Sequence, residues 1–267
     1  MQLKEIEKLA ASVMEKAVDA KEVAGVNLLV LKDKAPVLSL QAGYADLENK
    51  VLMADDTIMR LYSMSKPVTA ACMMILMQRG LVDLNDPVSK FIPAFANQTY
   101  VNGNALSLVQ RPMTVHDLLF MTSGLSYGSD SAAGKATSDL FAEMDARLST
   151  KDAMTTREFA DRVGKNPLEF EPSSNFMYGV SADILGALIE VISGMSFAEF
   201  LKKEITDPLE MPDTGFFVPA QKQSRLSKVY ARTENGLTLY TGDHLAIKNK
   251  WIPFRHFSQA VPVLFLH

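Results

Sequence analysis

The stretch Leu61-Tyr62-Ser63-Met64-Ser65-Lys66-Pro67-Val68 decides how this sequence of 267 residues is interpreted. Ser63 and Lys66 are three residues apart, so on a helix their side chains share one face within a single turn. A serine hydroxyl becomes a nucleophile when a neighbouring base accepts its proton, and a lysine whose pKa is lowered by burial can be that base. Pro67 fits a first helical turn, where its missing N–H would have no intrahelical partner. The free N–H groups of a helix start can also bind an oxyanion.

The spacing alone is a weak signal, because a chain of this size contains about one Ser-x-x-Lys by chance. This sequence contains one such motif, and it lies where a helix is expected to begin. The alternative interpretation is a capping serine beside a solvated lysine.

The residues before this stretch predict a helix followed by a hairpin. Apolar residues recur at three- and four-residue spacing over 3–20, which is typical of a helix with one apolar face. Two β-rich runs, 25–31 and 36–44, flank the short polar segment 32–35 and predict two paired strands.

The residues after it predict mainly helices. Residues 66–79 are apolar almost all round, which indicates a fully buried helix. A short capped helix is expected from Thr114, a capping box at 155–158 predicts another, and 178–193 and 196–205 predict two more. The Ser-, Gly- and Ala-rich residues 126–137 predict a mobile surface loop.

The composition excludes several classes of protein. With 48% hydrophobic and 22% charged residues the chain can bury a large core, so general disorder is excluded. Its 27 basic and 31 acidic residues give a net charge of −4, which argues against a nucleic-acid partner. The single Cys72 excludes a disulfide framework. No uncharged apolar stretch approaches the roughly 18 residues of a membrane span, and the charged first residues do not resemble a signal peptide, so we expect a cytoplasmic protein without a membrane partner.

Four ordered stretches resemble the serine β-lactamase and penicillin-binding-protein superfamily, in its class C-like branch that includes family VIII carboxylesterases. They are Ser63-Met-Ser-Lys66-Pro with the segment from Gly80 to Lys90, Met113 to Leu125, Tyr178 to Gly186, and Asp207 to Phe216. The resemblance extends over roughly residues 5–250 and implies a β-lactamase/transpeptidase-like α/β (α+β) fold, with helices beside an antiparallel sheet.

The resemblance also implies roles for three residues. Ser63 is the expected acylated nucleophile, Lys66 its proton acceptor and electrostatic partner, and Tyr178 the general base or acid that passes the proton to the leaving group. In this family the tyrosine usually opens Tyr-x-Asn, but Val180 stands in the Asn place. Without an amide to hold the acylamino group of a β-lactam, an esterase is favoured over a lactamase.

A second motif offers a competing nucleophile. Gly124-Leu-Ser126-Tyr-Gly128 matches the Gly-x-Ser-x-Gly elbow of α/β-hydrolases, which requires a strand before the serine and a helix after it. Here a helical pattern precedes Ser126 and a loop-like composition follows it. The acid and the histidine of such a triad would have to be Asp243 or an earlier acid with His244, His256 or His267, and none of these lies in a sequence pattern that supports the role. We therefore favour Ser63.

No other residues predict a cofactor or a metal. The four histidines are scattered, which is not typical of a metal site. Met73, Met74 and Met77 are expected in the core, and the acidic residues near Asp83 are expected to cap a turn.

The C-terminal part departs from the family. Its members carry a third motif, Lys-Thr-Gly or His/Trp-x-Gly, on a strand that walls the active site; here only Tyr240-Thr-Gly242 resembles it, and too early. Codons for Ser258 to His267 can be chosen so that the same DNA, read from two bases later, encodes Ser-Gly-Gly-Ala-Gly-Leu-Val-Ser-Thr. That shifted sequence resembles the family at this point. We therefore expect a frameshifted, C-terminally truncated member that lacks the later strands.

The sequence thus predicts a single β-lactamase-related domain over 1–267. Within it, residues 1–60 are a helix and the first two sheet strands. Residues 61–215 are a helical region that carries the Ser-x-x-Lys and Tyr motifs, and 216–267 are an incomplete return towards the sheet. The expected function is cofactor-free hydrolysis of a small-molecule ester or amide through an acyl-serine. The alternative is a catalytically impaired binding or scaffold module, and the open sheet edge predicts association into a homo-oligomer.

Overall fold

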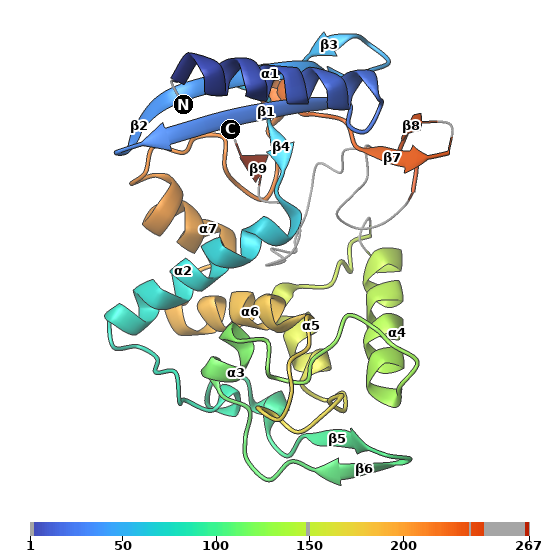
Figure 1. Cartoon of the computed structure of the whole chain (residues 1–267). Helices are drawn as coiled ribbons and strands as arrows, with labels where there is room; N and C mark the ends of the chain where they lie inside the picture. Colours follow the sequence, from blue (N-terminus) through green and yellow to red (C-terminus); the bar gives the residue numbers. More distant parts are fainter. Residues whose placement is uncertain (1–2, 148–149, 235, 243–264, 267) are drawn as a thin grey trace. The chain divides into compact units, whose positions relative to one another are not determined.

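The computed structural model describes residues 3–147, 150–234, 236–242 and 265–266 (Figure 1). These form two compact units: residues 3–60 with the described residues after Phe217, and Leu61–Phe217. The expected divisions after 60 and 215, within one domain, are not tested by these two units. That the chain folds as one domain stays a prediction.

The first unit contains a helix and short antiparallel sheets. Helix α1 (Leu3–Asp19) is followed by β1 (Gly25–Lys32), β2 (Ala35–Asp46) and β3 (Val51–Leu52), which form a sheet in the order β1-β2-β3. The helix and the hairpin predicted from the sequence are therefore confirmed. The remaining strands pair as β4 (Met59–Arg60) with β9 (Phe265–Leu266) and as the hairpin of β7 (Tyr230–Thr233) and β8 (Gly236–Leu239).

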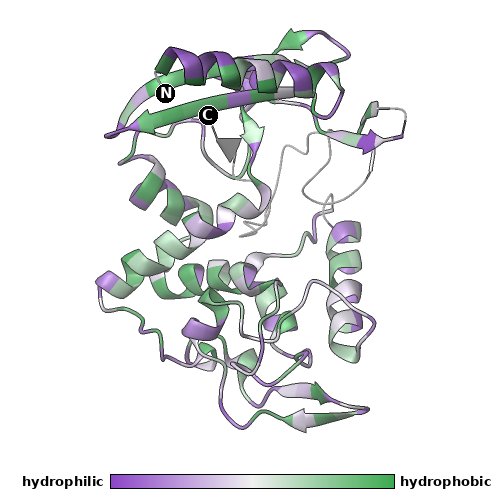
Figure 2. Ribbon diagram, viewed as in Figure 1, coloured by the Kyte–Doolittle hydropathy of each residue, from purple (hydrophilic) through white to green (hydrophobic). Residues whose placement is uncertain are grey.

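The apolar face of α1 is only partly covered in this unit. Met14 is buried, but Leu9 and Val13 are each 58% exposed. Figure 2 shows hydrophobic and hydrophilic residues interspersed along α1.

The second unit carries most of the helices. In chain order its elements are η1 (Tyr62–Met64), α2 (Ser65–Gln78), η2 (Val88–Lys90), η3 (Pro93–Phe95), β5 (Thr99–Asn102), β6 (Ala105–Leu108), α3 (Val115–Leu119), α4 (Ala132–Arg147), α5 (Thr156–Val163), α6 (Ser181–Ser193), α7 (Phe197–Leu201) and the π-helical turn η4 (Lys202–Thr206). The helices predicted from 114, 155 and 196 are confirmed, although the last continues as the π-helical turn η4. The helix predicted from 178 is also present, but it begins at Ser181, so Tyr178 lies outside it. Ser193-Gly194 ends α6, where Gly194 adopts the left-handed conformation that favours glycine.

Helix α6 is the centre of this unit. Every residue from Ser181 to Ile189 is buried, and α2, α3, α5 and α7 all contact the helix. A helix that is apolar on all sides requires such surroundings. The element therefore fixes the position of the residues that precede it, including Tyr178.

Two expectations about this unit are wrong in part. Residues 128–130 are exposed and lie outside any helix, as a surface loop would, but α4 begins at Ala132, and both Ala133 and Gly134 are buried. A Cβ on Gly134 would lie 2.1 Å from the backbone N of Ser129, so the small residues allow the start of α4 to pack closely on the preceding chain. Helix α2 is not buried all round, since Met74 is 44% exposed.

Among the described residues no single helix is long and apolar enough to cross a membrane. Ser181–Ser193 and Phe197–Thr206 pass this test only as a pair bent by 81°.

Candidate active site

Ser63 lies in the 3₁₀ turn η1, immediately before α2, so it stands at the helix start where the motif was expected. The backbone N–H of Ser65 donates to the carbonyl oxygens of Tyr62 and Ser63, which ties this turn to the start of the helix. Tyr62 has a φ of +47°, a strained conformation for a residue with a side chain. The turn leaves the side chain of Ser63 exposed to solvent.

Lys66 lies in the first turn of α2, and its ammonium reaches back to the serine. Lys66 Nζ donates a hydrogen bond to Ser63 Oγ at 3.1 Å. The proximity predicted from the three-residue spacing is therefore present. Lys66 is only partly buried, whereas a lysine that acts as the base was expected to be buried.

Tyr178 comes from the segment before α6 and meets Lys66 through its ring. Lys66 Nζ lies 4.4 Å from the centroid of the Tyr178 ring, within the range of a cation–π contact. Burial raises the pKa of Tyr178, but hydrogen-bonding interactions with Lys66 and Ser63 and the charge of Lys66 outweigh it, so this pKa lies below its ordinary value of 10.0. The structure thus brings all three expected residues together.

Sequence reasoning missed two residues beside this group. The ring of Tyr127 lies 5.8 Å from the ring of Tyr178 and 5.6 Å from Lys66 Nζ. Asp183, in the first turn of α6, is 4% exposed and acts electrostatically on both tyrosines. Burial and the charge of Asp183 raise the pKa of Tyr127. The only signal for Tyr127 was its place inside the Gly-x-Ser-x-Gly motif.

Gly179 sets the distance between the two segments that carry the tyrosines. A Cβ at this position would lie 1.9 Å from the carbonyl oxygen of Leu125 and 2.9 Å from Cα of Ser126. Only glycine therefore allows the chain before Tyr127 to pass directly against the chain after Tyr178.

Ser126 is not a nucleophile elbow. It is 5% exposed, its hydroxyl has no hydrogen-bond partner among the described residues, and α3 rather than a strand precedes it. A buried hydroxyl without a base has neither access to a substrate nor a proton acceptor. Asp243, His244, His256 and His267 lie outside the described residues.

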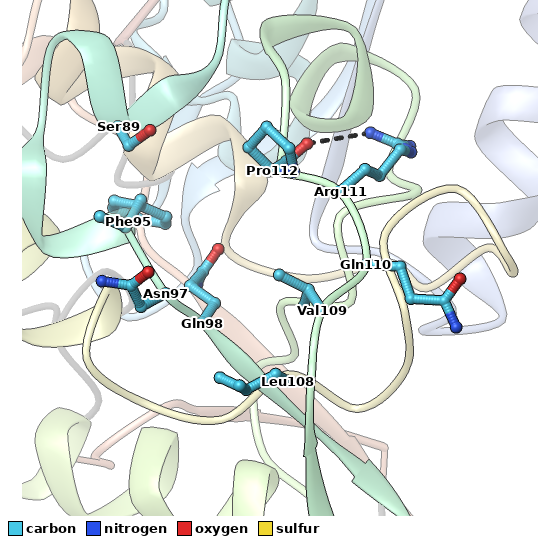
Figure 3. A pocket seen from close by; sticks show the side chains of 10 residues that line it. Ser89, Phe95, Asn97, Gln98, Leu108, Val109, Gln110, Arg111 and Pro112 are labelled. Carbon is cyan, nitrogen blue, oxygen red and sulfur yellow. Dashed lines mark hydrogen bonds between the residues drawn. The ribbon is translucent and has the colours of Figure 1, made fainter.

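A separate hollow of about 320 Å³ lies in the same unit, and Figure 3 shows the side chains that line it. Its lining includes Phe95, Gln98, Leu108 and Pro112, and none of Ser63, Lys66 and Tyr178. Both amide atoms of Gln98 are inaccessible to solvent and have no partner in the described part of the chain. The hollow is therefore not the site that Ser63 forms.

Within the described ranges no three histidine, cysteine or carboxylate side chains lie close enough together to hold a metal ion. His116 instead stacks on Phe120, with ring centroids 4.3 Å apart. Cys72 is buried, and burial raises the pKa of its thiol to about 12.

Val180 occupies the position where the family usually has asparagine. It is fully buried at the start of α6, so it presents no group to the site. Tyr240-Thr241-Gly242 follows β8 in the first unit and is not in a strand. The segment from Ser258 to His267 falls almost wholly outside the described residues.

Comparison with known proteins bears on this geometry. The profile of the family described as Beta-lactamase matches residues 10–243. The chain belongs to the beta-lactamase family. Among its relatives, Esterase EstB of Burkholderia gladioli is 30% identical over 210 residues, covering 77% of this chain and 50% of EstB. Acyltransferase calJ of Penicillium decumbens is 27% identical over 222 residues, covering 80% of this chain and 50% of calJ.

Solved structures show the same fold. The structure titled EstCE1, a hydrolase with promiscuous acyltransferase activity, superposes with a TM-score of 0.82 at 23% identity and covers 99% of this chain and 70% of EstCE1. The octameric penicillin-binding protein homologue from Pyrococcus abyssi gives a TM-score of 0.66 at 28% identity, covering 88% of this chain and 50% of that protein. The fold is thus the mixed α/β fold of the family, as predicted, and the chain spans about half the length of the curated relatives it matches.

Proposed function

We propose that this chain is a serine hydrolase that acts on small esters or amides through an acyl-serine intermediate. The observation that carries the proposal is the 3.1 Å contact of Lys66 Nζ with Ser63 Oγ, made while the same ammonium lies on the ring of Tyr178. Three groups that meet in this way supply a nucleophile, a positive charge and a proton acceptor.

The arrangement favours a different catalytic role for each of the three side chains. The charge of Lys66 and its hydrogen-bonding interaction lower the pKa of Tyr178, which makes the phenolate more accessible near neutral pH. Tyr178 then accepts the proton of Ser63 as its Oγ attacks the substrate carbonyl, and returns it to the leaving group. Water releases the acyl group by the reverse sequence. The expected role of Lys66 as the proton acceptor itself stays a prediction.

Two observations support an ester as the preferred substrate. A relative of this chain bears the name esterase and another the name acyltransferase, and both activities pass through transfer of an acyl group. The buried Val180 leaves the site without the amide that the family uses at this place. We expect no cofactor and no nucleic-acid partner, and these expectations, like the cytoplasmic location, stay predictions.

Hydrolysis of p-nitrophenyl butyrate tests the proposal. We expect turnover by the chain, loss to background in Ser63→Ala, and retention in Ser126→Ala, which removes the hydroxyl of the competing motif. Turnover that survives in Ser63→Ala overturns the assignment of the nucleophile. A folded chain without turnover and without covalent labelling of Ser63 favours the binding or scaffold module instead.

A further inference from the structure

Aromatic rings connect the candidate catalytic tyrosine to the core of the second unit. Phe159 of α5 is 1% exposed, and its ring centroid lies 5.6 Å from that of Phe141 on α4. Phe141 lies 6.2 Å from Tyr127, which lies 5.8 Å from Tyr178. Ring pairs at these separations attract one another beyond the area that they bury. Tyr127 is thus the last fixed ring before Tyr178, whose own side chain is 48% exposed.

Tyr127 also faces the ammonium of Lys66. Lys66 Nζ lies 5.6 Å from the Tyr127 ring and 4.4 Å from the Tyr178 ring, so two rings face one charge. Such contacts hold a flexible lysine side chain in one place. The same ammonium donates to Ser63 Oγ. A displacement of Tyr127 would therefore affect both Tyr178 and Lys66.

The hydroxyl group of Tyr127 does not explain why this residue lies beside the candidate site. This oxygen is inaccessible to solvent and has no hydrogen-bond partner among the described residues, so it does not reach a substrate. The ring is the part of Tyr127 that contacts the site.

We propose that Tyr127 is a positioning residue, whose ring fixes the Tyr178 ring and the Lys66 ammonium in the arrangement that serves Ser63. The effect of Tyr127 on catalysis rests on the proposed function. The placement itself is a property of the folded chain. The tight approach at Gly179 holds the backbone before Tyr127 against the backbone after Tyr178 and so supports the same arrangement.

The ionisation of Tyr178 reports on this placement without any turnover. The groups that act on Tyr178 are Lys66 on α2, Ser63 on η1, Asp183 on α6 and the ring of Tyr127. Lys66 and Ser63 lower its pKa, whereas burial and Asp183 raise it. If the Tyr127 ring holds Lys66 in place, loss of that ring weakens the interactions with Lys66 that lower the pKa of Tyr178.

The experiment is an ultraviolet titration of tyrosinate in the full chain. Because the chain has seven tyrosines, each curve is measured as a difference against the same protein carrying Tyr178→Phe. In Tyr127→Phe we expect the pKa of Tyr178 to stay at its wild-type value, and in Tyr127→Leu to rise by about half a unit or more. In parallel, kcat should fall about tenfold in Tyr127→Leu with KM little changed, and Tyr127→Phe should restore it.

The controls separate the possible failures. Phe120→Leu removes one ring of the His116 pair, away from the site, and should change neither the titration nor kcat. Phe141→Leu, one ring further from Tyr178, replaces Tyr127→Leu if circular dichroism shows the latter unfolded, and should raise the pKa of Tyr178 in the same direction. An unchanged or lower pKa in the ring-deleted variant overturns the inference. A wild-type chain that neither turns over esters nor labels at Ser63 overturns the proposed function but leaves the titration readable.

Discussion

Lys66 makes two contacts at once: a hydrogen bond to Ser63 and a contact with the Tyr178 ring. A single ammonium thus polarises the candidate nucleophile and stabilises the phenolate form of the candidate base. In the proposed mechanism the chemistry depends on the distance between these side chains rather than on burial of Lys66.

Replacement of Tyr178 by phenylalanine tests its role directly. The ring and its contact with Lys66 would remain, but the proton acceptor would be lost, so we expect kcat/KM to fall by about 10²- to 10⁴-fold. In the unmodified chain kcat/KM should rise with pH, because the proposed base is the phenolate form of Tyr178. The midpoint of that rise should lie below the ordinary tyrosine pKa of 10.0. A pH profile of Tyr178→Phe that kept this rise would contradict the assignment.

Gln98 offers a prediction about stability. It is 4% exposed, and neither its amide nitrogen nor its amide oxygen has a partner among the described residues. Methionine has a similar shape without the unpaired amide, so Gln98→Met should stabilise the chain by about 1 kcal/mol. Urea unfolding of the two proteins measures this difference; destabilisation by the substitution would show that the amide is paired in solution.

Only part of the candidate site could be predicted from the sequence. The Ser63–Lys66 pair follows from local spacing on a helical turn. The place of Tyr178 came from the resemblance to the family. Tyr127 and Asp183 were not found, because their roles arise from packing between α4, α6 and the preceding turn, which a single sequence does not encode as a pattern.

Helix α3 depends on a buried carboxylate at its N-terminus. Asp117 has a fully buried side chain, accepts two hydrogen bonds of 2.8 Å from Arg111, and completes a capping box with Thr114. Burial raises the pKa of Asp117, but the hydrogen bonds from Arg111 and Thr114 outweigh it and hold this pKa below its ordinary value. The helix in turn contacts α6, the core of the unit.

Asp117→Asn should therefore lower the free energy of unfolding by about 3 kcal/mol near neutral pH. A carboxylate with a lowered pKa contributes its full stability above the ordinary carboxyl pKa of about 4 and loses it as the pH falls through the lower value in the folded chain. The difference between the two proteins should accordingly shrink on acidification to about pH 3.

Asp161→Asn is the matched control for this measurement. Its ion pair with Arg157 is 3.6 Å long and joins two exposed side chains, so its loss should cost less than about 1 kcal/mol. Equal losses in the two variants would contradict the account of α3.

At the level of elements, local signals explain most of the agreement between sequence and structure. The caps at Thr114, Thr155 and Ser196, and the glycine that ends α6, place helix ends correctly because their hydrogen bonds are local. Helix α4 was missed because its small residues favour a loop in isolation and form a helix through close packing at Gly134. The π-helical turn Lys202–Thr206 has no pattern in the sequence that would predict it.

For the whole molecule, the first sheet matters because β1 is an edge strand within the described residues. An edge with exposed apolar side chains favours pairing between chains. Leu29 on β1 is 56% exposed. We expect concentration-dependent self-association, and Leu29→Lys should reduce it, as measured by light scattering after size-exclusion chromatography.

Leu106→Lys provides the comparison. Leu106 lies on β6 in the other unit and is 54% exposed, so its substitution adds the same charge at similar exposure. A chain that stays monomeric at all concentrations, or two variants that dissociate equally, would contradict association through the edge of the first sheet.

The proposed function depends on Ser63 as the nucleophile of a hydrolase built on the fold of the beta-lactamase family. The most direct test treats the folded chain with a fluorophosphonate probe and locates the adduct by mass spectrometry, with Ser63→Ala beside it. We expect one adduct per chain, on the peptide that contains Ser63, and none in the variant. An adduct on Ser126 or on another serine, or a folded chain that forms no adduct, would contradict it.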